Sequence, residues 1–211
     1  MTAKLLAFAV LVLPVALLAA DQPKITAYER SQGWRLLDKT EWHGFGANKL
    51  PANWQVRDGS LVGGAGVAIV SNDEFADFEL TFDWKVAPGG NGAVYFRVFE
   101  DEKSPEKSGP VMLLAGHGDA LAGNGLRAPD KKITPQFDVW YRSKIVVFGN
   151  AVEYWINGEK ITGYALDTAD WRQAVAASAN PTVAKFVNER GGRLAFAGEG
   201  LEVRNVKVRG I

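Results

Sequence analysis

Two titratable side chains, His117 and Asp119, lie close together in an irregular part of the sequence. They fall in residues 116–132, which are rich in glycine and show neither helical nor strand periodicity. Long irregular segments in a compact domain are uncommon, and they often carry function. Either side chain could act there as a general base. The alternative is that this loop histidine is simply solvated and has no chemical role.

A second pair, Tyr95 and Arg97, belongs to the most regular part of the chain. Residues 78–86 alternate strictly between apolar and polar side chains, which is typical of a half-buried strand. Residues 88–92 interrupt the pattern with Pro-Gly-Gly-Asn-Gly, and a second strand follows over residues 93–98. We predict an antiparallel hairpin in which Tyr95 and Arg97 share the face opposite the apolar one. They would form either a solvated surface pair or a ligand platform. The first strand should bury its apolar face, made of Phe78, Leu80, Phe82, Trp84 and Val86.

The elements around these residues are short strands joined by tight turns. Asp58-Gly59 and Asn157-Gly158 are strong hairpin signals, and they separate residues 54–57 from 60–63 and 152–156 from 159–164. Further strands are expected at residues 33–37, 67–70, 111–114, 140–148, 193–196 and 201–208. Residues 42–50 and 100–108 are interpreted as loops, and residues 168–178 as the only convincing helix.

The last predicted strand changes phase, because its apolar positions alternate up to Val203 and resume at Val206. Such a slip predicts a β-bulge near Arg204 and Asn205. Together these elements predict an all-β sandwich or jelly roll of two antiparallel sheets with one short helix.

Composition excludes several classes of function. Lys plus Arg equals Asp plus Glu at 24 each, so the net charge gives no reason to expect nucleic acid or an anionic membrane as a partner. The absence of cysteine excludes disulfides, thiolate metal sites and a cysteine nucleophile. The two histidines, His43 and His117, are too few for a multi-histidine zinc site.

The first twenty residues are interpreted as a secretory signal peptide. Lys4 supplies a positive charge, an apolar run follows, and Ala19-Ala20 precede the polar Asp21. An uncleaved membrane anchor is the alternative, although the apolar run is short for a bilayer. We expect cleavage before Asp21, a single domain over residues 21–211, a bacterial periplasmic or secreted location, and no membrane contact after cleavage.

The order of several motifs resembles the 3-keto-disaccharide hydrolase domain family, also described as 3-keto-glucoside lyases or 3-keto-2-hydroxy-glucal hydratases. The matching pieces are Gly-Trp-Arg-Leu-Leu-Asp at 33–38, Trp54 to Gly63, Asp-Phe-Glu-Leu at 77–80, Gly-Gly-Asn-Gly at 89–92 running to Arg97, Trp140 to Asn150, Glu-Tyr-Trp-Ile-Asn-Gly at 153–158, and Val-Arg-Asn-Val-Lys-Val at 203–208. The resemblance covers almost the whole mature chain, and it implies a concanavalin-A-like jelly roll.

The resemblance also implies chemistry on sugars oxidised at carbon 3. The keto group acidifies the neighbouring C2 hydrogen, so that a base can remove it, the C1 substituent leaves, and water adds back. Such a site needs a general base and either donors or a metal ion to stabilise the oxyanion. No cofactor is expected from the residues themselves, and a divalent metal ion enters only through the resemblance.

Two segments depart from the family pattern. Members commonly carry a Glu-Met/Tyr-Gln-type segment after the central strands, where this chain has Val111-Met112-Leu113. Members also carry Leu-Gln-Asp-His-Gly near the end, where this chain has Phe-Ala-Gly-Glu-Gly at 196–200. Glu199 replaces the family histidine, and it is either a substitute base or an exposed turn carboxylate.

The candidate catalytic residues are therefore His117, Asp119 and Glu199. The candidates for binding substrate are Arg97, Tyr95, Trp155 and Asn91. The planar fork of Arg97 could hold a sugar oxygen, although an ion pair with Asp83 or Glu79 is the alternative. Tyr95 and Trp155 could stack on a sugar ring or could be packing aromatics, and Asn91 could serve only the turn. Two hypotheses follow, a 3-keto-glycoside hydrolase or lyase, and a non-catalytic carbohydrate-binding or cell-envelope module on the same scaffold.

Overall fold

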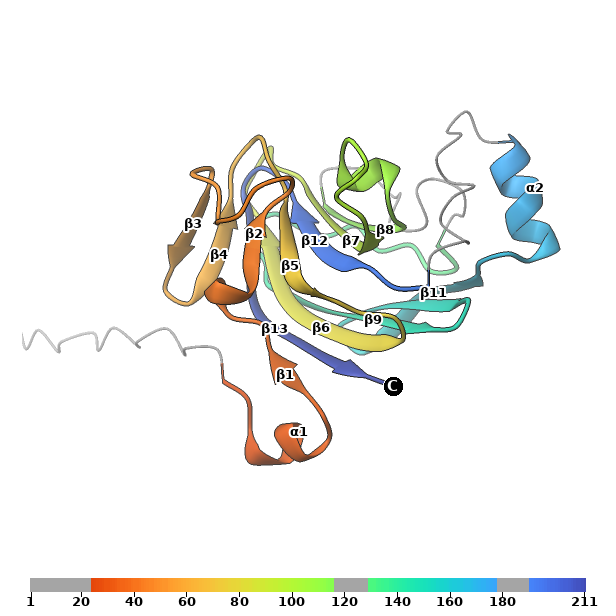
Figure 1. The fold of residues 1–211 in the computed structure, drawn as a ribbon, viewed down its shortest axis with the longest axis horizontal. Helices are drawn as coiled ribbons and strands as arrows, with labels where there is room; N and C mark the ends of the chain where they lie inside the picture. The colour runs from red at the N-terminus through yellow and green to blue at the C-terminus, as the bar shows by residue number, and fades with distance from the viewer. Residues whose placement is uncertain (1–23, 116–128, 178–189) are drawn as a thin grey trace, which may run out of the picture.

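The computed structural model describes residues 24–115, 129–177 and 190–211, and it places two antiparallel sheets face to face (Figure 1). The eight-stranded sheet has the order β11-β10-β9-β6-β13-β4-β3, with β1 also paired to β13. Its strands are β1 (Arg35–Leu36), β3 (Trp54–Arg57), β4 (Ser60–Gly63), β6 (Phe78–Val86), β9 (Tyr141–Phe148), β10 (Ala151–Ile156), β11 (Glu159–Ala165) and β13 (Leu201–Gly210). The all-β sandwich predicted from the sequence is confirmed.

The second sheet has five strands in the order β2-β5-β12-β7-β8. These are β2 (Trp42–Gly44), β5 (Ile69–Glu74), β7 (Gly92–Val98), β8 (Val111–Ala115) and β12 (Arg193–Ala197). The helices of the described residues are α1 (Ala27–Ser31), α2 (Ala169–Ala177) and the short 3₁₀ turns η1 (Lys39–Glu41) and η2 (Pro105–Lys107). None of these helices is long and apolar enough to cross a membrane.

The predicted hairpin between residues 78–86 and 93–98 is wrong. Strand β6 pairs with β9 and β13 in one sheet, and β7 pairs with β12 and β8 in the other. Alternation identifies the apolar face of a strand, but it does not identify the strand's partner. The apolar faces of β6 and β7 meet across the sandwich, where the rings of Phe78 and Phe96 lie 6.1 Å apart.

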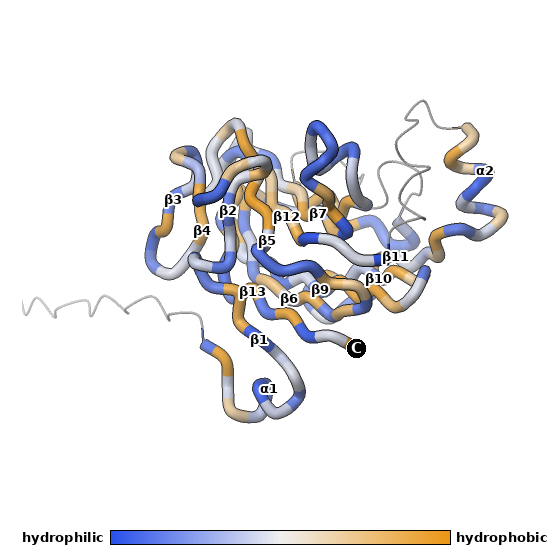
Figure 2. The backbone as a smooth tube through the Cα atoms, in the orientation of Figure 1, coloured by the Kyte–Doolittle hydropathy of each residue, from blue (hydrophilic) through white to orange (hydrophobic). Residues whose placement is uncertain are grey.

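The core contains the side chains that the alternation predicted. Phe82 and Trp84 are fully buried. The indole nitrogen of Trp84 donates a 2.8 Å hydrogen bond to Ser143 Oγ, so its one polar atom is satisfied. Figure 2 shows hydrophobic residues interspersed with hydrophilic ones along the strands of both sheets.

The predicted bulge in β13 is confirmed. The pairing of β13 with β6 shifts between Arg204 and Lys207, and Asn205 has a φ of 52°. Val203 and Val206 both point into the core, while Arg204 and Asn205 lie side by side on the outer face. A bulge of this kind places two consecutive side chains on one face of a strand.

The structure differs from the prediction in two expected loops and in one helix that was not predicted. Residues 42–44, expected in a loop, form edge strand β2, and the expected exposed loop at 100–108 contains η2 with Pro105 buried. The helix predicted over 168–178 is α2, and Thr168 Oγ1 accepts the Trp171 N–H at 3.2 Å, which caps the helix at its N-terminus. The sequence prediction missed α1, which has a capping box between Thr26 and Glu29.

Candidate functional site

The outer face of the five-stranded sheet carries a row of side chains across its whole width. His43 pairs with Val70, which pairs with Ala195, followed by Tyr95 and Val111. Four of these five are apolar or aromatic and buried, and His43 stands at the polar end. Burial raises the pKa of Tyr95, and the nearby Glu106 carboxylate, 3.4 Å from the Tyr95 hydroxyl, raises it further.

The neighbouring row is also apolar. Ala93 on β7 pairs with Leu113 on one side and Ala197 on the other. Leu113, Ala197 and Phe45 are all partly exposed, and each packs against the buried side chains of this face. The middle of this face is therefore an apolar patch, which we define as Phe45, Ala93, Tyr95, Leu113 and Ala197.

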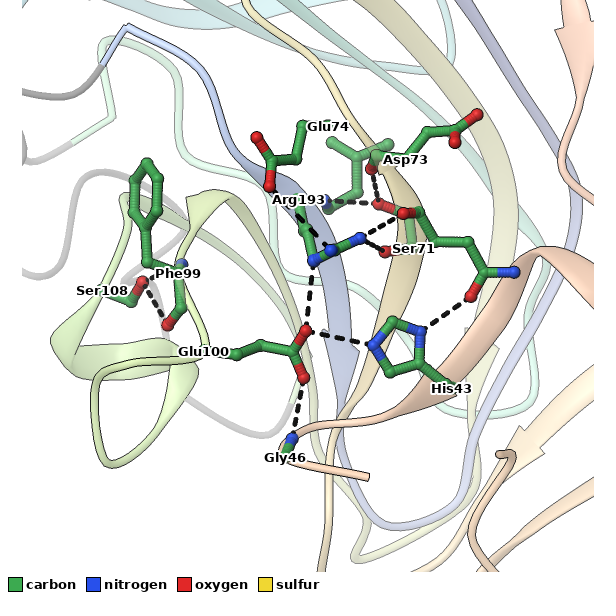
Figure 3. A network of polar contacts seen from close by, with 11 residues as sticks. His43, Gly46, Ser71, Asp73, Glu74, Phe99, Glu100, Ser108 and Arg193 are labelled. Atoms are coloured by element: carbon green, nitrogen blue, oxygen red, sulfur yellow. Dashed lines mark hydrogen bonds and ion pairs between the residues drawn. The ribbon is translucent and has the colours of Figure 1, made fainter. Parts of the chain in front are cut away.

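A polar network borders this patch at the β2 edge (Figure 3). His43 Nε2 lies 3.1 Å from Glu100 Oε2, and His43 Nδ1 lies 2.7 Å from Asn72 Oδ1. Arg193 Nε contacts the same Glu100 oxygen at 3.1 Å, and Glu100 Oε1 accepts the Gly46 N–H at 2.8 Å. Partial burial would raise the pKa of Glu100, but the bonds from Gly46 and His43 outweigh burial and hold the pKa below its usual value.

This network ties four separate segments together. Both oxygens of Glu100 are already occupied by donors, so the carboxylate is held as an anion rather than presented as an open base. A histidine beside a carboxylate has the composition of an acid–base pair. The sequence prediction missed His43, Glu100 and Arg193 as a group. Trp42 and Gly44 are buried and His43 is half-buried, and the sequence signal for this was only a polar residue after an apolar one.

Arg97 does not share the outer face with Tyr95, so that part of the prediction is wrong. Its φ of 55° turns the strand, and Val98 then packs with Tyr95 instead of with Phe96. The Arg97 side chain is 1% exposed, and its Nη2 donates to the carbonyl oxygen of Gly149 at 2.5 Å. Its Nε and Nη1 are buried without a hydrogen-bond partner among the described residues.

The alternative ion pair for Arg97 is wrong as well. Asp83 instead accepts bonds from Arg142 at 2.7 and 3.2 Å, and Glu79 pairs with Arg209 at 2.5 Å. Burial lowers the pKa of Arg97 from its ordinary value, because a buried guanidinium loses its hydration.

Asn91 and Glu199 lie next to each other at the end of the sandwich. The Asn91 N–H donates to the Glu199 carbonyl oxygen at 2.9 Å, and Asn91 Oδ1 accepts the Glu199 N–H at 3.2 Å. The Glu199 side chain itself is exposed. Asn91 therefore joins the β6–β7 connection to the β12–β13 turn.

Trp155 lies on the other sheet, away from Tyr95. It is half-buried on β10, its Nε1 donates to Glu153 at 3.0 Å, and the Lys144 ammonium lies 4.3 Å from its ring. His117 and Asp119 lie outside the described residues, so their predicted roles stay predictions. Within the described ranges, no group of three His, Asp or Glu side chains could hold a metal ion, so these residues do not offer the donors that the resemblance implies.

A model of the 3-keto-alpha-glucoside-1,2-lyase-like domain matches residues 33–209. The chain belongs to this family. It is 24% identical to the 3-keto-disaccharide hydrolase of Bacteroides thetaiotaomicron over 214 residues, which cover 80% of this chain and 73% of that protein. The resemblance inferred from the motifs is thereby confirmed.

Solved structures with the same fold include a putative glycosyl hydrolase from Parabacteroides distasonis, with a TM-score of 0.81 and 24% identity over 90% of this chain and all of the other. The carbohydrate-binding module CBM66 from Bacillus subtilis has a TM-score of 0.52 and 15% identity over 79% of this chain and 94% of the other. At these identities the two structures establish the fold alone.

Proposed function

We propose that this chain is a carbohydrate-binding member of its family with little or no 3-keto-glycoside-cleaving activity. The main observation in support of this proposal is the apolar patch on the five-stranded sheet. Leu113 and Ala197 occupy positions where the family pattern has polar residues, and both pair with Ala93. These two positions are far apart in the sequence but lie on either side of Ala93 in the sheet. Both departures from the family pattern therefore remove polar groups from the same surface.

The backbone at Gly198 supports the same proposal. Gly198 stands where the family pattern has an aspartate, and its φ of 151° is unfavourable for any residue with a side chain. A Cβ at this position would overlap the carbonyl oxygen of Asn91 and lie 2.9 Å from the Cα of Gly92. The local structure is therefore built around the loss of that side chain.

An apolar patch that includes aromatic rings suits the binding of a sugar. The C–H face of a pyranose ring packs against aromatic and aliphatic side chains, while polar groups at the border bond its hydroxyls. Phe45 is the partly exposed ring of the patch, and the network of His43, Glu100 and Arg193 supplies polar groups beside it. A relative named 3-keto-disaccharide hydrolase and a carbohydrate-binding neighbour agree with a sugar as ligand.

The test combines turnover and binding. The purified protein is incubated with 3-keto-trehalose and a 3-keto-β-glucoside, with and without divalent metal, and product release is followed. We expect no turnover at ordinary enzyme rates, because losing one charge-stabilising group already costs about 10²–10³ in rate. Binding of the same sugars, measured by calorimetry, should weaken in Phe45→Ala and remain unchanged in Phe148→Ala, an exposed aromatic at the end of β9 in the other sheet.

One result would contradict the proposal. Turnover at enzyme rates that His117→Ala abolishes would establish the family's elimination and hydration chemistry in this chain. That alternative draws support from family membership.

We also infer that the chain is exported with cleavage before Asp21. Mass spectrometry of the protein from the bacterial envelope should give a mass that begins there, and an intact Met1 would contradict the inference.

A further inference from the structure

A polar groove of about 620 Å³ lies on the outer face of the eight-stranded sheet, on the other side of the sandwich from the apolar patch. It is formed where the β13 bulge meets β6, β9 and the segment that leads into β1. We propose that this groove binds a carboxylate-bearing sugar, with the Arg204 guanidinium holding the carboxylate and Trp34 contacting the ring.

The β13 bulge creates the groove floor. It places Arg204 and Asn205 side by side on the outer face, and the register then sets Arg204 opposite Asp83 and Asp83 opposite Arg142. A cation, a carboxylate and a second cation therefore stand in one row across three strands. A regular β13 would turn one of the two bulge residues into the core.

The charges in this row are unevenly satisfied. Asp83 is almost fully buried, and it accepts two bonds from Arg142 and one of 2.7 Å from Asn205 Nδ2. Burial would raise the pKa of Asp83, but the bonds from Arg142 and Asn205 outweigh it and keep the pKa below normal. The hydrogen bonds to this carboxylate come from Arg142 and Asn205, whereas Arg204 acts on it only through its charge.

Arg204 is held in place without a hydrogen-bonding partner on its Nε. Its guanidinium carbon lies 3.9 Å from the ring centroid of Trp140, and Nε is buried with no acceptor among the described residues. Nε is covered by protein and cannot itself meet a ligand, but the two terminal nitrogens of the guanidinium are not buried and make no hydrogen bond to the described residues, so they are open to an acceptor. A guanidinium fixed against an aromatic ring is preorganised to bind a planar carboxylate through two parallel bonds.

The remaining lining favours a sugar acid over a simple anion. Trp34 lines the groove with a half-buried ring that has the Arg209 guanidinium 5.0 Å from its centroid, and Thr81 contributes a hydroxyl. The Glu29 carboxylate also lines the groove, with its oxygens bonded to Lys207 and to the Thr26 N–H. The lining holds four cationic and two acidic side chains, which gives an excess of positive charge. A free phosphate or sulfate ion would fill little of this volume and would face the two carboxylates.

The experiment titrates the purified protein with glucuronate, a galacturonate disaccharide, the matching neutral sugars, inorganic phosphate and sulfate, and follows heat and Trp fluorescence. Binding of the uronates should weaken at least about tenfold in Arg204→Gln, since a charge-assisted bidentate contact is worth more than 1.4 kcal/mol. Arg57→Gln removes the same charge from an exposed site on β3 and should leave binding unchanged. Phe45→Ala should also leave it unchanged, which separates this groove from the apolar patch.

Several results would overturn the proposal. The wild-type protein could fail to bind uronates, or could bind the neutral sugars equally well. Phosphate or sulfate could bind as tightly as the uronates, which would make the groove a general anion site. Arg204→Gln and Trp34→Ala could both bind like the wild type while circular dichroism shows them folded, which would place the ligand elsewhere.

Discussion

At the scale of single residues, Arg97 places a guanidinium in the interior, and two of its three nitrogens have no hydrogen-bond partner in the part of the chain that the structure describes. Arg97→Met should leave the free energy of unfolding within about 1 kcal/mol of the wild type or raise it. The charge-assisted bond to Gly149 is worth about 1.5–3 kcal/mol, but two buried nitrogens without partners among the described residues each cost about 1–3 kcal/mol. Urea denaturation measures the difference. Arg97→Ala is the control, since it also removes packing, and equal destabilisation by both substitutions would contradict this view.

Trp84 is expected to be among the most costly residues to truncate. It is fully buried, stacks on Tyr141 with ring centroids 5.0 Å apart, and has its indole N–H satisfied by Ser143. Trp84→Ala should lower the free energy of unfolding by about 3–5 kcal/mol. Chemical denaturation tests this, with Phe148→Ala as an exposed control that should change stability by less than about 0.5 kcal/mol.

At the scale of elements, the β12–β13 turn depends on Gly198. Gly198→Ala should destabilise the protein by clearly more than Gly89→Ala. Both glycines have positive φ, so both substitutions introduce about 1–2 kcal/mol of backbone strain. Only at Gly198 would the added Cβ also overlap the Asn91 carbonyl, whereas nothing lies within 4 Å at Gly89. Thermal unfolding of the two variants compares them directly, and equal melting temperatures would contradict the overlap.

The attachment of α1 should depend on pH. The hydrogen bond from Lys207, followed by the Thr26 cap, lowers the pKa of Glu29 to about 2. Because the folded pKa is depressed, the stabilisation is complete above the unfolded value near 4.5 and is lost as the pH falls toward 2. Glu29→Gln should reduce the loss of stability between pH 5 and pH 2, measured by urea denaturation. The difference in stability between the variant and the wild type will be small because Glu29 is partly exposed.

The positions of the strands could be predicted from the sequence more fully than the partners with which the strands pair. Period-two patterning located β6 with both of its ends, and a phase slip located the β13 bulge. Nothing in the alternation showed that residues 87–91 cross from one sheet to the other. Strand β2 was missed because it is three residues long and ends in glycine, and α1 because its five residues carry no buried side chain.

The site was harder to predict for a different reason. The direction of the Arg97 side chain depends on one positive φ, and residue types alone do not reveal it. The His43 network joins residues 29, 57 and 121 positions apart in the sequence, so no local pattern contains it. The substituted family positions were visible in the sequence, but their convergence around Ala93 required the register of three strands.

At the scale of the whole molecule, β13 joins parts of the chain that are far apart in sequence. It lies between β6 and β4 and also pairs with β1. A chain truncated after Gly200 should therefore fail to fold rather than lose only a terminal strand, because β6 and β4 would both keep an unpaired edge. Circular dichroism and limited proteolysis of this truncation test the expectation. A truncation at Gly210 removes only the exposed Ile211 and is the control.

The central place of β13 also bears on when the protein can fold during its synthesis. The ribosome makes β6 and β4 well over a hundred residues before the strand that joins them, so neither can complete its sheet while translation is under way. The emerging polypeptide would remain extended and accessible to chaperones until nearly all of it has left the ribosomal tunnel. A chain in that state would suit the export proposed above, since threading through a narrow translocation channel requires an unfolded polypeptide.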